Sequence, residues 1–172
     1  MIIGICCVDN NWGIGEKNEL LYRLPLDMKR FAKITSGKVV AMGANTFRSL
    51  PKSQQPLKKR LNIVLCSEGT ELPKQVVACH SFQAFLALIQ WTSEINDVYI
   101  IGGGQVFKSM IPYYDKILIT KVDALAPEAD VFFPNLDKDY ADQFEISEES
   151  EPIKDNGYTT KYITYIRKSE NN

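Results

Sequence analysis

The sequence has little of what marks membrane, nucleic-acid-binding and disulfide-rich proteins. Its apolar opening, residues 2–8, is far shorter than the roughly 20 residues of a membrane-spanning helix, and no basic segment of a signal peptide precedes it. The 20 basic and 21 acidic residues give a net charge of −1, without bulk attraction for nucleic acid or a membrane. The four cysteines show no C-x-x-C spacing, which argues against a metal site or a disulfide framework. We therefore expect a cytoplasmic protein.

The length, composition and pattern of apolar runs predict one α/β domain over residues 1–168, followed by a frayed tail at 169–172. Hydrophobic residues at 45% and charged residues at 24% are typical of a globular protein. Apolar runs alternate with helical patterns, which indicates a largely parallel sheet with helices on both faces. The predicted strands are 2–8, 39–42, 61–65, 76–78, 98–101 and 117–122, and the predicted helices are 25–35, 45–50, 81–91 and 105–111. Residues 143–147 and 158–165 predict an antiparallel hairpin at the sheet edge.

Asp27 is the most informative single residue. It lies in the first turn after Pro25, where acids are common because they favour the helix dipole. The apolar positions of the same helix are Leu24, Met28, Phe31 and Ile34, and Asp27 falls on their face. A buried carboxylate without a partner is costly, so its pKa rises until it can hold a proton near neutrality. This placement favours a role in proton transfer.

Two strands end in glycine turns that lead into helices. Residues 98–101 run into Gly102-Gly103-Gly104, and residues 39–42 run into Gly43-Ala44-Asn45-Thr46. Backbone amides at such turns can hold a phosphate, although a tight turn without a ligand explains glycines equally well. A third feature is the long connection over residues 8–25, which is either a lid or a surface loop with a packed Trp12. Two glycine turns at strand ends fit a ligand lying across the sheet edge.

Taken in order, these features resemble the dihydrofolate reductase family from Met1 to about Arg167. The family implies a single domain with four helices and an eight-stranded sheet, parallel except for its last strand. It also implies reduction of 7,8-dihydrofolate to 5,6,7,8-tetrahydrofolate by hydride transfer to pterin C6 and protonation at N5. The motifs in register are Ile14-Gly15, Leu24-Pro25-x-Asp27-x-x-x-Phe31, Met42-Gly43-x-x-Thr46-Phe47-x-Ser49-Leu50, Arg60-Leu61-Asn62-Ile63-Val64-Leu65 and Ile100-Ile101-Gly102-Gly103-Gly104-Gln105-Val106-Phe107.

By this resemblance Asp27 binds the pterin and promotes its protonation, and Thr120 orients the Asp27 carboxyl. Tyr22 stands where many relatives carry tryptophan, and Leu20 lies in the lid. Arg60 matches the arginine that clamps the α-carboxylate of the folate glutamate. The implied catalytic residues are Asp27, Tyr22, Leu20 and Thr120, and the implied substrate-binding residues are Ile5, Asp27, Met28, Phe31, Ser49, Leu50, Leu57, Arg60, Ile101 and Thr120.

The resemblance also implies NADPH as the cofactor and a cis peptide between Gly102 and Gly103. Ala44 and Gln105 stand at two positions where many relatives carry basic residues, so discrimination against NADH is expected to be weaker than usual. The implied cofactor-binding residues are Cys7, Ile14, Gly15, Asn18, Leu20, Gly43, Ala44, Asn45, Thr46, Leu65, Cys66, Ser67, His80, Ile101, Gly102, Gly103, Gly104, Gln105, Val106 and Phe107. The implied partners are dihydrofolate and antifolate inhibitors, with no nucleic acid or membrane, and the expected state is a monomer.

Two alternatives stay open on the sequence. One is a reductase of the same fold that acts on another heterocycle, such as a pyrimidine of riboflavin synthesis, against which Asp27 and Arg60 argue. The other is a non-catalytic nucleotide-binding or regulatory module. The glycine turns would suffice for that module, but a buried Asp27 would have no use in it.

Overall fold

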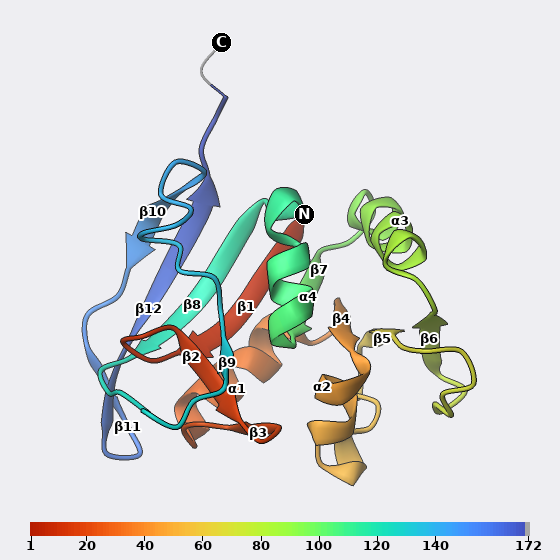
Figure 1. Ribbon diagram of the computed structural model, residues 1–172, viewed down its shortest axis with the longest axis horizontal. Helices are drawn as coiled ribbons and strands as arrows, with labels where there is room; N and C mark the ends of the chain where they lie inside the picture. Colours follow the sequence, from red (N-terminus) through yellow and green to blue (C-terminus); the bar gives the residue numbers. More distant parts are fainter. Residues whose placement is uncertain (171–172) are drawn as a thin grey trace.

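A twisted sheet forms the centre of the computed structural model, which describes residues 1–170 (Figure 1). β12 (Tyr158–Arg167) runs antiparallel to both β10 (Phe144–Glu149) and β8 (Lys116–Val122), and the strand pairs from β8 across to β6 (Val76–Cys79) are parallel. The expected mostly parallel sheet with an antiparallel last strand is confirmed. Along the sheet the strands are β10 (Phe144–Glu149), β12 (Tyr158–Arg167), β8 (Lys116–Val122), β1 (Ile2–Val8), β7 (Val98–Gly102), β4 (Val39–Gly43), β5 (Leu61–Leu65) and β6 (Val76–Cys79), with β11 (Ile153–Asp155) paired to β12.

The four predicted helices are present, with ends that differ by one or two residues. Pro25 begins the first, as expected, and the hydroxyl of Ser81 caps the third by accepting from the amide of Ala84 at 3.1 Å. The second and fourth begin one residue earlier than predicted and end earlier, because Leu50 is extended and a 3₁₀ turn follows Met110. The helices are α1 (Pro25–Thr35), α2 (Ala44–Ser49), α3 (Phe82–Ser93) and α4 (Gly104–Ser109), with 3₁₀ turns η1 (Lys52–Gln54) and η2 (Ile111–Tyr113).

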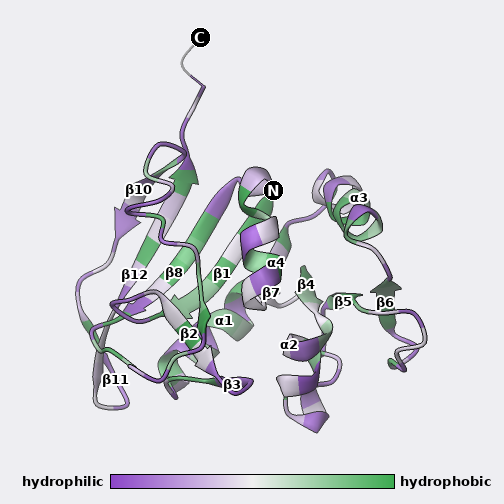
Figure 2. Cartoon of the chain, viewed as in Figure 1, coloured by the Kyte–Doolittle hydropathy of each residue, from purple (hydrophilic) through white to green (hydrophobic). Residues whose placement is uncertain are grey.

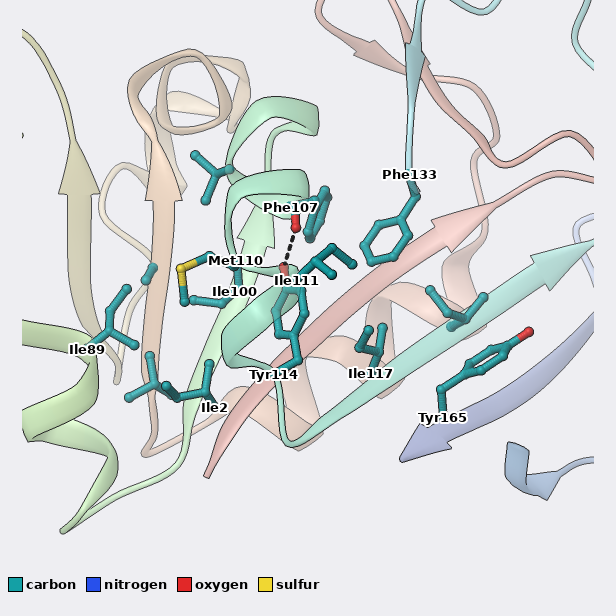
Figure 3. Close-up of a cluster of buried hydrophobic side chains, with 14 of the residues drawn as sticks. Ile2, Ile89, Ile100, Phe107, Met110, Ile111, Tyr114, Ile117, Phe133 and Tyr165 are labelled. Carbon is teal, nitrogen blue, oxygen red and sulfur yellow. Dashed lines mark hydrogen bonds between the residues drawn. The ribbon is translucent and has the colours of Figure 1, made fainter. Parts of the chain in front are cut away.

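Helices cover both faces of the sheet, as predicted. Phe85 of α3 and Phe107 of α4 belong to the larger buried cluster, in which the Tyr114 hydroxyl donates to the Phe107 carbonyl at 3.1 Å (Figure 3). Phe31 of α1 and Phe47 of α2 belong to the cluster on the other side. Hydrophobic residues accordingly concentrate along the central strands (Figure 2). Burial of these side chains is what holds the strand ends in place.

The connection over residues 8–25 is more regular than expected. Residues Lys17 and Asn18, with φ of 48° and 65°, form a tight turn that joins two short strands into a hairpin. Trp12 is buried against Phe133 and Tyr165 and anchors the base of this connection. Strands this short leave no periodic pattern, so the sequence did not indicate them. The small sheet consists of β3 (Glu19–Leu20), β2 (Gly13–Glu16) and β9 (Val131–Phe132).

The predicted antiparallel pairing of residues 143–147 with 158–165 at the sheet edge is confirmed, but the tight hairpin expected to join them is wrong. β10 pairs with the far half of β12, where Phe144 lies opposite Arg167. The tight turn at Asn156 and Gly157 instead joins β12 to β11, a strand that sequence reasoning missed. Within residues 1–170 no helix is long and apolar enough to cross a membrane. Of the predicted tail, residues 171 and 172 lie outside the described part of the chain.

Candidate active site

The predicted site residues meet along one edge of the sheet, at the carboxyl ends of the parallel strands. Cys7 at the end of β1 lies opposite Thr120 of β8. On the other side of β1, Gly102 of β7 lies opposite Met42 of β4, and Gly43 lies opposite Leu65 of β5. This edge is where ligands bind in open α/β sheets.

Asp27 and Thr120 form the central contact of the site, although 93 positions separate them in the chain. The Thr120 hydroxyl donates to Asp27 Oδ1 at 2.6 Å. Thr120 is 2% exposed, and Asp27 is half-buried at the start of α1. The Thr120 hydroxyl therefore sets the orientation of the Asp27 carboxyl group.

The pKa of the Asp27 carboxyl is raised above its ordinary value. Burial is the largest cause, and the negative charge of Asp155 acts in the same direction. The Thr120 hydrogen bond and the charge of Arg30 lower the pKa and oppose the shift. A carboxyl group raised in this way holds its proton closer to neutral pH, as a proton-transfer site requires.

A hollow opens beside Asp27 between α1 and the residue 8–25 connection. Predicted catalytic and cofactor residues Leu20, Tyr22, Cys7 and Ile14 lie around it. Met28 was expected to be buried with the apolar face of α1, but it is 53% exposed, whereas Leu24 is 3% exposed. Met28 borders the hollow, which explains its exposure. The lining residues are Cys7, Ile14, Leu20, Leu21, Tyr22, Leu24, Asp27 and Met28.

The hydroxyl of Tyr22 turns to Asp9 rather than to Asp27. It donates to Asp9 Oδ2 at 3.2 Å, and its ring meets the edge of Tyr158 at a centroid distance of 5.1 Å. Burial and the neighbouring Asp9 charge raise the pKa of Tyr22 to about 12. Tyr22 therefore stays protonated and acts as a hydrogen-bond donor at neutral pH.

Asp9 is a functional candidate that sequence reasoning missed. It is fully buried, and its Oδ1 accepts from the amides of Asn11 and Gly13, both at 2.9 Å. Its Oδ2 accepts from the amide of Ala126 at 3.0 Å and from Tyr22. The carboxylate thus joins the end of β1, both ends of the residue 8–25 connection and the loop after β8. A polar residue directly after an apolar strand was the only signal in the sequence.

The apolar substrate positions lie on the α1 and α2 side of the sheet. All of them belong to the buried cluster there or pack against it, with the exception of Met28 and Ser49. Ser49 is exposed, and its hydroxyl donates to the carbonyl of Thr46 at 2.7 Å. The clustered positions are Ile5, Phe31, Leu50, Leu57 and Ile101.

Arg60 lies beside this apolar wall without an ion-pair partner among residues 1–170. Its guanidinium carbon is 6.0 Å from the Phe31 ring centroid, and its buried Nε has no hydrogen-bond partner within the same range. Burial lowers the pKa of Arg60, which still leaves the guanidinium charged at neutral pH. Buried Asn62 fixes the preceding loop, because its amide group donates to the carbonyls of Leu57 and Arg60 at 2.9 and 3.0 Å. Arg60 is therefore a cation whose backbone is fixed by Asn62 and whose guanidinium has no anionic partner within residues 1–170.

The turn over residues 102–104 approaches its neighbours too closely for side chains. The peptide between Gly102 and Gly103 is cis, as the resemblance implied. A Cβ atom on Gly102 would lie 3.1 Å from the Thr46 hydroxyl, and one on Gly104 would lie 2.7 Å from a Val131 methyl group. No side chain caps the helices that follow Gly43 and Gly103, so their first amides stay free for a ligand.

The predicted adenosine side of the cofactor site carries little positive charge. Ala44 is half-buried, and exposed Gln105 donates to the Ser109 hydroxyl at 3.4 Å. His80 is exposed beside the end of β5, with Nδ1 3.2 Å from the Cys66 carbonyl. The other predicted cofactor residues are spread over several elements. Gly15 and Asn18 belong to the β2–β3 hairpin, Asn45 to α2, Val106 and Phe107 to α4, and Ser67 follows β5.

Comparison with known proteins identifies one family. The family model described as dihydrofolate reductase matches residues 1–167. The dihydrofolate reductase of Schistosoma mansoni is 30% identical over 179 residues, covering 96% of this chain and 96% of that protein. The dihydrofolate reductase of Haemophilus influenzae is 32% identical over 155 residues, covering 90% and 91%.

A solved structure agrees in fold and length. It is a dihydrofolate reductase from Enterococcus faecalis complexed with NADP(H) and RAB-propyl, with a TM-score of 0.82 and 30% identity, covering 98% of this chain and 97% of that chain. The bifunctional dihydrofolate reductase-thymidylate synthase of Glycine max is 32% identical over 178 residues. Those residues are 95% of this chain but 33% of that protein, so the chain spans about a third of the bifunctional relative.

Proposed function

The chain belongs to the dihydrofolate reductase family, which reduces 7,8-dihydrofolate to 5,6,7,8-tetrahydrofolate with NADPH, and we propose that the reaction takes place in the hollow beside Asp27. The observation that carries this proposal is the half-buried Asp27 carboxyl, held by Thr120 at 2.6 Å. Residues 1–168 would form a single catalytic domain, consistent with the family match over residues 1–167.

Asp27 is proposed to bind the amino edge of the pterin and to promote protonation at N5. Its raised pKa supports this role, because a carboxyl group that can hold a proton near neutrality can share or transfer that proton. Thr120 would fix the carboxyl orientation. Leu20 and Tyr22, which border the hollow, would help to exclude water once substrate is bound.

The apolar wall and Arg60 are proposed to bind the rest of the folate molecule. Phe31, Leu50 and Leu57 would contact its benzoyl ring, and Arg60 would form a bidentate ion pair with the α-carboxylate of its glutamate. The unpartnered Nε of Arg60 and its place 6.0 Å from the Phe31 ring support this role. Antifolate inhibitors, which bind members of the family, would occupy the same pocket.

The two glycine turns are proposed to hold the cofactor pyrophosphate, because their free amides and lack of side chains fit a phosphate group. When bound, NADPH supplies the hydride. Backbone groups of Cys7 and Ile14 would position its nicotinamide. Ala44 and Gln105 offer no cation to the adenosine 2′-phosphate, so NADH would be accepted more readily than in relatives with basic residues there.

The remaining proposals concern the state and surroundings of the protein. The near-neutral net charge of −1 supports a protein without a nucleic-acid or membrane partner. Cys6, Cys7, Cys66 and Cys79 are free, which supports the reducing cytoplasm as its compartment. We propose a monomer, the default state for one small domain, and the family match over residues 1–167 is consistent with such a domain.

The test is the loss of reduced-nicotinamide absorbance when 7,8-dihydrofolate is added to purified protein. NADPH and NADH are compared in parallel, and methotrexate serves as the inhibitor control. We expect turnover that methotrexate abolishes, with NADPH preferred over NADH. Binding of both ligands without turnover would contradict the proposal and favour a regulatory role for the same pocket.

A further inference from the structure

Helix α1, which carries Asp27, begins without a cap of its own. Leu24 at the cap position makes no side-chain hydrogen bond to the helix, and Pro25 has no amide hydrogen. The first helical bond runs from the amide of Met28 to the carbonyl of Leu24 at 2.9 Å. The amides of Leu26 and Asp27 are therefore the two donors that the first turn leaves without a helical partner.

Both donors are satisfied by one distant carboxylate. Asp155 Oδ1 accepts from the amide of Leu26 at 3.1 Å, and Asp155 Oδ2 accepts from the amide of Asp27 at 3.0 Å. Asp155 is 3% exposed and ends β11. The next residue, Asn156, donates to the carbonyl of Arg23 at 2.9 Å. The β11–β12 turn thus holds the chain on both sides of Pro25.

We propose that Asp155 is a positioning residue of the reductase site: its carboxylate fixes the first turn of α1 and, through it, the direction of the Asp27 side chain. This inference rests on the proposed role of Asp27. It goes beyond that role because Asp155 lies 128 positions away and acts through the backbone of the residue that touches substrate.

The topology supports the proposal, because one strand links both supports of Asp27. Asp155 pairs with Tyr158 at the start of β12, and Tyr162 farther along β12 pairs with Thr120 of β8. Asp155 holds the backbone of Asp27, and Thr120 holds its carboxyl group. A shift of the β11–β12 hairpin would therefore move the acid relative to the hollow.

The charged and titratable groups around Asp27 oppose one another. Asp155 raises its pKa, whereas Arg30, whose guanidinium carbon lies 4.1 Å from the Tyr162 ring centroid, lowers it. The other titratable neighbours are the thiols of Cys6 and Cys7 and the hydroxyl of Tyr162, whose pKa values are raised by burial, so these groups are neutral. Without the charge of Asp155, burial would still raise the pKa of Asp27 but with less support, so Asp27 would ionise at lower pH.

The experiment compares Asp155→Asn with wild type and with the control Asp142→Asn. Asparagine keeps the size of the side chain and one acceptor oxygen but removes the charge. Asp142 is exposed and precedes Phe144, which pairs with the far end of β12, so its variant removes an equal charge elsewhere. Two quantities are measured between pH 5 and 9: kcat with saturating NADPH, and the titration of the Asp27 carboxyl carbon by NMR.

For Asp155→Asn we expect both midpoints to move to lower pH, by roughly one unit or less. At neutral pH kcat would fall by up to about tenfold, with a smaller change in KM, and the loss would shrink as the pH is lowered. Asp142→Asn would follow wild type. Asp155→Glu, which keeps the charge on a longer chain, would leave the NMR midpoint closer to wild type than Asp155→Asn does.

Unchanged midpoints in Asp155→Asn would overturn the proposal, and so would an equal loss of kcat at every pH. If that variant does not fold, wild type decides the matter. The amides of Leu26 and Asp27 should then exchange with solvent more slowly than exposed amides without a partner, and equally fast exchange would overturn the cap. Absence of dihydrofolate turnover by wild type would contradict the proposed function, whereas the NMR titrations test Asp155 without any turnover.

Discussion

At Asp27 burial and hydrogen bonding act in opposite directions on a single carboxyl group. Burial raises its pKa, and Thr120 and Arg30 hold the shift in check. Asp27→Asn should lower kcat with dihydrofolate near neutral pH by about 100-fold or more, because the group that promotes protonation is gone. Activity should partly return at acidic pH, where the substrate arrives already protonated. Steady-state rates from pH 5 to 9 check this, with exposed Asp139→Asn as control. An unchanged rate at neutral pH would remove Asp27 from the mechanism.

Arg60 is a cation without an ion-pair partner among residues 1–170. Its removal should weaken the binding only of ligands that carry a carboxylate. Arg60→Leu should weaken dihydrofolate binding by roughly 10- to 100-fold, the effect of losing a charge-assisted pair. A pterin without the glutamate tail should bind nearly as before. Fluorescence titration with both ligands measures the difference, and Lys58→Leu, at an exposed cation nearby, is the matched control. Equal losses for the two ligands would refute the ion pair.

Substitutions at Ala44 test whether the adenosine 2′-phosphate of the cofactor lies beside the start of α2. Ala44→Arg should tighten NADPH by roughly tenfold and leave NADH unchanged, because only NADPH carries the 2′-phosphate. Ala44→Leu adds bulk without charge and separates the two effects. Dissociation constants for both cofactors are measured by fluorescence. The same gain for NADH and NADPH would mean that position 44 does not face the phosphate.

Among the elements, the residue 8–25 connection combines a fixed base with an exposed tip. Trp12 is buried, and Asp9 joins four backbone or side-chain donors, whereas Leu20 is 77% exposed. Within this hairpin β2 is held by its pairing with β9, whereas β3 with Leu20 forms the exposed edge. This division fits a segment that closes over a ligand, which is how a lid excludes water.

The Tyr22 hydroxyl is the contact between Asp9 and the far end of that connection. Tyr22→Phe should lower the free energy of unfolding by about 1 kcal/mol, because Asp9 loses one donor but keeps three. Amide hydrogen exchange should accelerate at residues 17–21. Urea unfolding and exchange measured by mass spectrometry check both effects. The control is Tyr113→Phe, since the Tyr113 hydroxyl makes no hydrogen bond within residues 1–170. Exchange at 17–21 that matches wild type would show that Tyr22 does not restrain the hairpin.

For the whole molecule, the raised pKa of Asp27 has a cost in stability. A carboxyl group with a folded pKa above its unfolded value stabilises the fold when protonated, and this contribution is lost as the pH rises through the folded value. Ionised Asp27 therefore destabilises the protein at neutral pH. Asp27→Asn should raise stability there by a few tenths to about 1 kcal/mol, and the gain should vanish below about pH 4. Thermal unfolding at pH 4 and pH 7 tests the sign, and a destabilised variant at pH 7 would contradict it.

The sequence by itself determined the succession of strands and helices along the chain and the position of Asp27 on the first helix. Apolar runs and the Pro25 and Ser81 signals are local, so β1, β4, β5 and β7 and the four helices could be located within one or two residues. Asp27 and the glycine turns were identified because each breaks a local pattern that packing alone would favour, whereas Arg60 was identified through the family resemblance.

Only the tertiary structure decided how these residues are supported. Asp9 accepts from Ala126, and Asp155 accepts from Asp27, across 117 and 128 positions of chain. No local pattern records such contacts, because they depend on which loops the sheet brings together at its edge. The strands β3, β9 and β11 are likewise too short for any periodicity and exist only through their neighbours. The sequence alone indicated the acidic role of Asp27, whereas the roles of the Asp9 and Asp155 carboxylates in fixing the chain around it became apparent only in the tertiary structure.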